Sequence, residues 1–263
     1  MNERDRLSKL KGRVARIVKD QKGITGLETA IILIAFVVVA SVFAYTVLSA
    51  GIFSSERGKE AVYAGLQQAR SSMEPRGSTL AYDDADVYDS TGTTKVADAG
   101  TAVTKISFVV SNAVAGEPVD LTPPYYFEDT GDDYDDDTTS GEGLVPSGLE
   151  CVTVISYNDE QQFINDVAWT VEFVGKTSGD YLLETGEKAE ITVWLLNYVD
   201  SEPDGTPDMY KLGVDDTDPF IDDANNLLGK NTQFTLEVKA PHGAVLTIQR
   251  ITPARLDTVM NLH

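Results

Sequence analysis

The sequence predicts an α+β protein, in which a long N-terminal hydrophobic helix precedes an antiparallel β-sandwich head. Three observations lead to this fold class: an uncharged run over residues 29–55, later segments rich in Val, Ile, Thr and aromatic residues, and turn sequences between those segments. With 263 residues, 42% of them hydrophobic, the chain is long enough to bury a core and is not wholly disordered.

The N-terminal element begins with a basic segment and continues as an apolar helix. Residues 1–23 contain eight basic and three acidic residues, and the run that follows is uncharged. A helix of roughly 20 apolar residues crosses a bilayer core of about 30 Å. The alternative is the buried core helix of a soluble protein, but this run is longer than a small soluble core hides. By the positive-inside rule, the basic segment stays in the cytoplasm and the rest of the chain lies outside.

The helix is expected to continue beyond the apolar run as a more polar segment. Hydrophobic residues recur near helical spacing after Gly51, among charged residues, until Pro75 and Gly77 stop the pattern. A single helix from Ile24 to Ser72 would be roughly 70 Å long at about 1.5 Å per residue. That is far longer than a membrane requires, and it is typical of a helix bundle at the centre of a filament.

Six segments of the remaining chain have the composition and spacing of β-strands. They are Val103–Val110, Cys151–Tyr157, Val167–Val174, Ala189–Tyr198, Gln233–Lys239 and Ala244–Ile251. Turn sequences separate them, and the sequence shows no alternation of helices with strands. Short antiparallel strands at this spacing predict an immunoglobulin-like β-sandwich. Trp169 and Trp194 lie within two of these segments and are expected in its core.

The composition disfavours several classes of function. The net charge is −21, so an acidic surface repels phosphate backbones and nucleic-acid binding is not expected. Cys151 is the single cysteine, which excludes an internal disulfide framework and a cysteine-based zinc site. A Ser-His-Asp triad or a histidine metal centre would depend on His242, because the other histidine is the last residue. We therefore expect no enzyme, assign no catalytic residue and expect no required cofactor.

The junction before the apolar run reads Lys22-Gly-Ile-Thr-Gly-Leu-Glu28. The stretch from Lys22 to Tyr45 closely resembles the class III signal peptide and N-terminal helix of archaellins, the archaeal flagellins. Residues 184–193 and 241–256 also resemble the closing strands of archaellin heads. The resemblance implies that residues 1–23 are a cleaved leader, residues 24–75 a filament-core helix and residues 76–263 a β-sandwich outer domain.

The resemblance also implies a cleavage site. In archaellins a membrane-embedded aspartyl peptidase, the prearchaellin signal peptidase, cuts after the glycine, here between Gly23 and Ile24. The junction suits such a cut, because Gly23 has no side chain and its backbone can extend into a protease cleft. Lys22 is expected at the cytoplasmic face of the membrane. Removing the leader deletes five net positive charges that would resist extraction of the helix from the membrane.

Glu28 is the ionisable group at the start of the apolar segment, and cleavage would make it the fifth residue. The likeness to bacterial type IV pilins, which share this helix type, implies that Glu28 meets a neighbour's N-terminal amine, here that of Ile24. The alternative is a carboxylate favoured by the macrodipole at the helix N-terminus, and the two roles can coexist. The residues expected to carry assembly are Glu28, Ile31, Ile34, Phe36, Val38 and Phe43.

Taken together, the resemblance implies a structural subunit of the archaeal swimming filament, the archaellum. Its partners would be identical chains or sister archaellins, after contact with the membrane and the signal peptidase. The precursor would lie in the cell membrane, and the filament would lie outside the cell. An archaeal adhesion pilin would share the leader and the helix. A membrane-anchored surface β-sandwich protein would not need the junction at Gly23, and both remain alternatives from the sequence.

One acidic loop has the spacing of a calcium site. Its candidate oxygen ligands are Asp200, Glu202, Asp204, Thr206 and Asp208. They match alternate positions of a calcium loop, with Gly205 at the sharp turn. However, Lys211 stands where such loops carry a bidentate Glu, and no helices are expected to flank the segment. Asp129–Asp137 is a second, weaker candidate. The alternative for both is a solvated acidic loop, so the expectation that Ca²⁺ binds here rests on the residue spacing alone.

Overall fold

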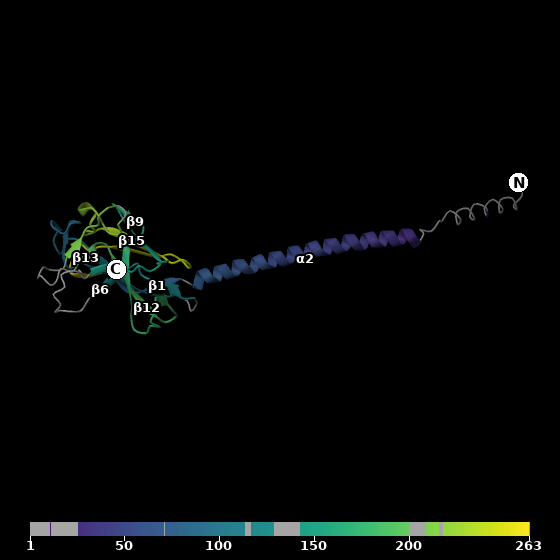
Figure 1. The fold of residues 1–263 in the computed structure, drawn as a ribbon, viewed down its shortest axis with the longest axis horizontal. Coiled ribbons are helices and arrows are strands. Elements are labelled where there is room, and N and C mark those ends of the chain that lie inside the picture. The colour runs from purple at the N-terminus through teal and green to yellow at the C-terminus, as the bar shows by residue number, and fades with distance from the viewer. Residues whose placement is uncertain are drawn as a thin grey trace. The chain divides into compact units, whose positions relative to one another are not determined.

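The structure, a computed structural model, describes residue 11 and residues 26–70, 72–113, 117–128, 143–199, 209–215 and 218–262. The chain divides into two compact units, Met1–Val62 and Tyr63–His263. Helix α2 spans Gly26–Arg70 and lies in the first unit up to Val62, and the second unit contains the end of the helix and the β-strands (Figure 1). These elements confirm the predicted fold class of an apolar helix followed by antiparallel sheets.

Helix α2 contains 45 residues, and its segment Gly26–Leu66 is long and apolar enough to cross a membrane. In its apolar part, the hydroxyls of Thr29, Ser41 and Thr46 donate to the backbone carbonyls three residues earlier, at 3.1, 2.8 and 2.8 Å. The helix ends at Arg70, slightly before the predicted end at Ser72.

The predicted stop at Pro75 and Gly77 needs correction. Both residues lie inside strand β1, Met73–Tyr82, and not in a connection after the helix. The expected boundary between residues 75 and 76 therefore falls within the first strand of the head. Only Thr79–Tyr82 of β1 pairs with the neighbouring strand β17, so Pro75 has β4 on one side and no ladder partner on the other. A proline is tolerated in such a position because no ladder hydrogen bond is lost.

Two sheets form the sandwich of the head. The first has the order β10 (Ala168–Phe173), β12 (Lys188–Trp194), β4 (Lys105–Asn112), β1 and β17 (Val259–Leu262). The second has the order β16 (Leu246–Ile251), β15 (Gln233–Lys239), β8 (Val154–Asp159) and β9 (Phe163–Ile164). Every strand pair within both sheets is antiparallel.

The strand order is that of an immunoglobulin fold. In chain order, strands β1, β4, β8, β10, β12, β15 and β16 take the places of strands A to G, because they form the sheets A-B-E-D and G-F-C. Strand β9 extends the second sheet beside β8, and β17 extends the first sheet beside β1. The immunoglobulin-like prediction therefore holds at the level of strand order.

Side chains from both sheets are buried in one hydrophobic core. Its largest members include Phe108 of β4, Trp169 of β10, Tyr157 of β8 and Phe234 of β15. Alternate residues of β15 are buried, as the period-two sequence pattern predicts. Trp169 and Trp194 both belong to the buried hydrophobic cluster, as expected, and Trp194 stands opposite Lys105 in register.

A further sheet is built from the connections between sandwich strands. This insert sheet has the order β3 (Lys95–Ala97), β2 (Asp86–Tyr88), β14 (Met209–Lys211), β13 (Asn197–Val199), β7 (Gly143–Pro146) and β6 (Tyr125–Glu128). Its β14–β2 pair is parallel, unlike the predicted antiparallel strands. Smaller elements are the pair β5 (Val119–Asp120) and β11 (Leu182–Leu183), and the 3₁₀ turn η1 (Ala224–Asn226).

Candidate functional site

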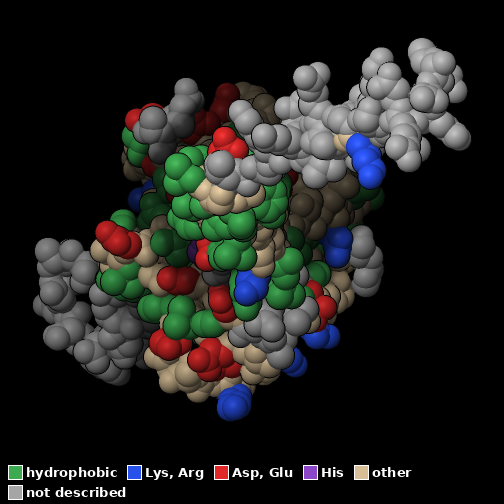
Figure 2. Space-filling model, turned by 90° about the vertical axis from the view of Figure 1, so that its right-hand side faces the viewer, with side chains coloured by type: hydrophobic (Ala, Val, Ile, Leu, Met, Phe, Trp, Pro, Cys, Tyr) green, Lys and Arg blue, Asp and Glu red, His purple; other side chains and the backbone are tan. Residues whose placement is uncertain are grey.

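Helix α2 presents apolar side chains on every side. Figure 2, in which the helix is seen close to end-on, shows hydrophobic side chains gathered around it. The large apolar residues predicted to carry assembly are all exposed within the chain: Ile31 59%, Ile34 65%, Phe36 72%, Val38 53% and Phe43 69%. A continuous apolar surface of this kind is stable against lipid or against other helices, and not in water.

The predicted cleavage and pairing residues are only partly within the described chain. Lys22, Gly23 and Ile24 lie outside the described residues, so the cut between them stays a prediction. Glu28 lies in the first turn of α2 and is exposed. A carboxylate at this place is favoured by the positive end of the helix dipole. The geometry therefore agrees with the dipole role of Glu28, whereas its pairing with the amine of Ile24 is untested.

One face of α2 carries a seam of small residues that the sequence analysis did not single out. We define the small-residue seam as Ala40, Ala44, Gly51, Ser54, Gly58, Ala61 and Gly65. Its members recur three, four or seven residues apart, and a seven-residue repeat keeps positions on one face of a helix. Val47 and Val62 lie on the same face, but the largest side chains, including Tyr45, Ile52, Phe53 and Tyr63, lie on other faces. The helix is therefore asymmetric in cross-section, with a shallow side and a bulky side.

Within the described part of the chain, the glycines of this seam have open space beside them. A Cβ atom built at Gly51, Gly58 or Gly65 would meet nothing within 4 Å. Glycine in a helix interior costs about 1 kcal/mol relative to alanine, so these glycines weaken the isolated helix. Small residues allow the backbones of neighbouring helices to approach closely. The seven-residue glycine spacing is visible in the sequence, but the open space around each glycine is not.

The predicted calcium ligands from Asp200 to Asp208 lie outside the described residues, as does the stretch Asp129–Asp137. Among the residues that the structure does describe, no group of three or more His, Cys, Asp or Glu could hold a metal ion. Cys151 is half-buried, and burial raises the pKa of its thiol to about 11, so it stays protonated near neutral pH. His242 is exposed in a bend before β16, as expected of a turn residue.

Comparisons with known proteins agree on one family. The archaeal-type flagellin profile matches residues 23–250. "Probable flagellin 1" of Archaeoglobus fulgidus is 32% identical over 252 residues, covering 94% of this chain and 98% of that protein. "Probable flagellin 1" of Aeropyrum pernix is 27% identical, covering 92% of this chain and 97% of that protein.

Among solved structures, the archaeal flagellum of Methanospirillum hungatei strain JF1 is similar with a TM-score of 0.47 and 22% identity, covering 91% of this chain and 99% of that chain. The profile match and the Archaeoglobus relative each extend over most of the chain, and they confirm the resemblance drawn from its two ends. The chain belongs to the archaeal-type flagellin family, a family of structural filament proteins.

Proposed function

We propose that this flagellin is cleaved after Gly23, leaves the membrane and assembles through α2 into the archaeal swimming filament, with identical chains or sister flagellins. The observation that carries the proposal is the 45-residue helix whose apolar side chains are exposed all round within the chain. Before assembly, lipid would cover this surface, and the precursor would be held in the cell membrane with its basic leader in the cytoplasm. After assembly, neighbouring helices would cover it in an appendage outside the cell.

Packing supplies the preference for the filament. Lipid tails are as apolar as the side chains of α2, so transfer from the bilayer to a helix bundle gains little from hydrophobicity alone. Association must therefore be favoured by close packing between helices, and the small-residue seam allows neighbouring helices to pack closely. The bulky side of one helix, with Tyr45 and Ile52, is complementary to the seam of another around Gly51. A contact between two different faces is heterologous, and a heterologous contact that does not close into a ring builds an open helical filament.

The leader and Glu28 would control when this packing begins. The leader carries a net charge of +5 and is expected to hold the precursor against the cytoplasmic face until the signal peptidase removes it. Cleavage would create an amine at Ile24, four residues before Glu28. A carboxylate buried among apolar helices is costly unless it is paired, so a neighbour's amine would offset that cost. Glu28 would thereby favour chains that have been processed.

The first test removes the helix. A fragment from Ser72 to His263 should be soluble, folded and monomeric, because it keeps every strand of the sandwich and loses α2. It begins at Ser72 because this residue is tied to the head: its carbonyl accepts from the Ala113 amide at 2.9 Å, and its hydroxyl accepts from the Ala244 amide at 3.3 Å. Sedimentation and electron microscopy, with the mature chain as the assembling control, check the result. Filaments formed by the fragment alone would contradict assembly through α2.

We also propose that the loop from Asp200 to Asp208 binds Ca²⁺ through alternating oxygen ligands. A bound ion would stabilise the folded chain by about 2.7 kcal/mol at a hundredfold excess over its dissociation constant. Chelator should therefore lower the melting temperature of the mature protein at matched ionic strength. Asp204→Ala should lower it in calcium buffer and remove the chelator effect, whereas Asp135→Ala should leave that effect intact. Equal melting of the wild type with calcium and with chelator would reduce the loop to a solvated turn.

A further inference from the structure

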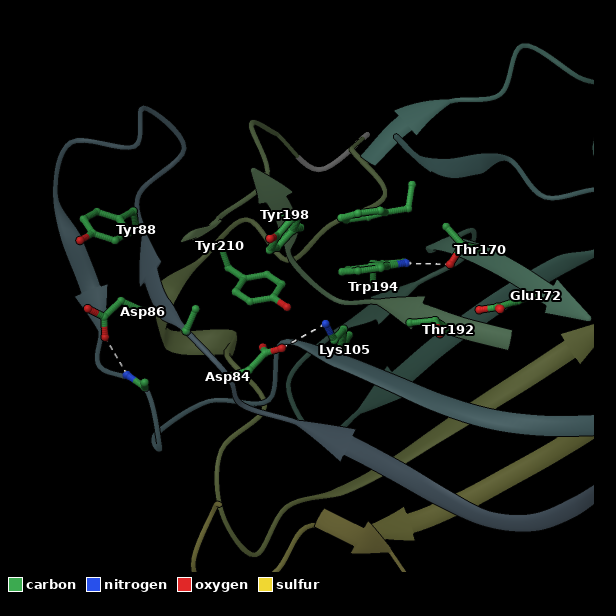
Figure 3. Close-up of a pocket in the computed structure, with 13 residues that line it drawn as sticks. Asp84, Asp86, Tyr88, Lys105, Thr170, Glu172, Thr192, Trp194, Tyr198 and Tyr210 are labelled. Carbon is green, nitrogen blue, oxygen red and sulfur yellow. Dashed lines mark hydrogen bonds and ion pairs between the residues drawn. The ribbon is translucent and has the colours of Figure 1, made fainter. Parts of the chain in front are cut away.

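An open groove of about 720 Å³ lies on the outward face of the first sheet of the sandwich (Figure 3). Trp194 of β12, Lys105 of β4 and Glu172 of β10 line it from the sheet, and Tyr198 and Tyr210 line it from the insert sheet. The volume is within the range of about 300–1,000 Å³ that is usual for small-ligand sites. Nothing in the filament function of the preceding section uses this groove, so its role is a separate question.

One wall of the groove is a row of aromatic rings in contact with one another. Phe127 stacks on Trp194 with ring centroids 6.0 Å apart and an interplanar angle of 11°. The ring centroids of Tyr198 and Phe127 lie 5.4 Å apart, and those of Tyr210 and Tyr198 lie 5.3 Å apart. Phe127 remains 43% exposed although it is a large apolar side chain. The wall therefore offers an apolar surface to whatever enters the groove.

Three of the charged side chains that line the groove are already in ion pairs: Asp84, Asp86 and Lys105. The Lys105 ammonium lies 3.1 Å from the Asp84 carboxylate and 4.9 Å from the centroid of Trp194. The second Asp84 oxygen accepts from Thr104 at 3.2 Å. Asp86 is paired with Lys95 at 2.7 Å. A cationic ligand would compete with the resident ammonium, and an anionic ligand would meet carboxylates on a chain of net charge −21. The groove is therefore suited to a neutral ligand.

Tyr210 and Glu172 both line the groove, but they differ in whether a ligand can reach them. The Tyr210 hydroxyl is fully enclosed beside Asp84 and Thr104, and Figure 3 shows it directed toward Lys105, so a ligand in the groove does not reach it. Burial raises the pKa of Tyr210 well above its usual range, so its hydroxyl keeps its proton. Glu172 is exposed and makes no ion pair within the described chain, and in register it stands opposite Glu190. Like charges directly opposite each other in a sheet are unfavourable.

We propose that this groove binds a neutral saccharide. The C–H face of a sugar ring would pack against the aromatic wall at Phe127 and Tyr198, and sugar hydroxyls would donate to the exposed carboxylate of Glu172. A sugar is neutral and its hydroxyls donate, so it fits a groove that combines an apolar wall with one exposed carboxylate acceptor at Glu172. A second copy of this acidic chain is a poorer occupant, because it would bring further carboxylates toward Glu172.

The test is a titration of purified wild-type filaments with maltotriose, cellotriose and triacetylchitotriose, followed by saturation-transfer NMR and calorimetry. We expect at least one of these neutral trisaccharides to bind. Phe127→Ala and Glu172→Gln should each weaken that binding about tenfold or more, because one removes the stacking surface and the other a charged acceptor. Phe127→Tyr should retain binding, since it keeps the ring. Glu190→Gln is the matched control: it removes the neighbouring carboxylate on the same face, outside the groove lining, and should bind as the wild type does.

Three results would overturn the proposal. The first is the absence of binding by all three sugars at millimolar concentration. The second is binding that Phe127→Ala and Glu172→Gln leave unchanged in filaments with wild-type circular dichroism. The third is disrupted filament packing in Phe127→Ala together with no sugar binding by the wild type, which would assign the groove to a neighbouring head. The proposal does not depend on how α2 assembles, because the same titration can be made on the chain in a non-glycosidic detergent.

Discussion

A Gly58→Leu variant should be made, processed and folded, yet it should yield no filaments. No described residue approaches a Cβ atom built at Gly58 within 4 Å, and leucine favours a helix more than glycine does. The isolated helix should therefore become more stable, by about 1 kcal/mol. A neighbouring helix seated in the small-residue seam would be pushed away by the four added carbons. Electron microscopy of cells and a swimming assay on soft agar measure the loss.

Lys59→Leu is the control for this variant. It introduces the same side chain at the adjacent position, which lies on a different face and already carries a long side chain, so filaments should still form. Gly58→Ala should have an intermediate effect, because one methyl group separates the backbones less than a whole leucine side chain. Normal filaments and swimming in Gly58→Leu would show that the seam does not face a neighbouring helix.

A Gly23→Val variant should accumulate as an uncleaved membrane precursor, and the cells should again lack filaments. The β-branched side chain would stand at the scissile bond, where a bare backbone is expected to fit the peptidase. Mass spectrometry of the N-terminus provides the measurement: the wild-type protein from filaments should begin at Ile24, and the variant should keep its leader. Gly26→Ala, three residues beyond the cut, should be processed normally. A wild-type chain that begins at Met1 would instead identify a permanently anchored protein.

Local sequence patterns predicted the elements that arise from one contiguous apolar run or from a strongly periodic pattern of side chains. The apolar run predicted α2, because an uncharged segment of that length and composition is typical of a helix. Strand β15 coincides with the predicted segment Gln233–Lys239. The predicted segment Ala189–Tyr198 is split into β12 and β13 by a turn at Leu195 and Leu196, which are buried and therefore look like strand residues in the sequence. Composition alone does not distinguish such a buried turn from a continuing strand.

The insert sheet could not be predicted because it depends on long-range pairing. Its strands β2, β3 and β14 have three residues each, too few for a periodic pattern to emerge. Strand β2 pairs with β14 more than a hundred positions further along the chain, with Met209 opposite Asp86. The groove has the same origin, because it forms only when Tyr198 and Tyr210 come beside Trp194. By contrast, the cleavage junction and Glu28 are read directly from contiguous sequence.

The position of β1 determines how the head withstands pulling. This strand follows α2 directly, and it pairs with β4 through seven residue pairs and with β17, the last strand of the chain, through four. Tension delivered along the helix would thus reach a strand held by backbone hydrogen bonds on both edges near Tyr82. The strand would have to break these bonds together before it could peel away from the sheet. The segment that follows α2 is thereby anchored in the interior of the first sheet, where both of its neighbours would resist its removal.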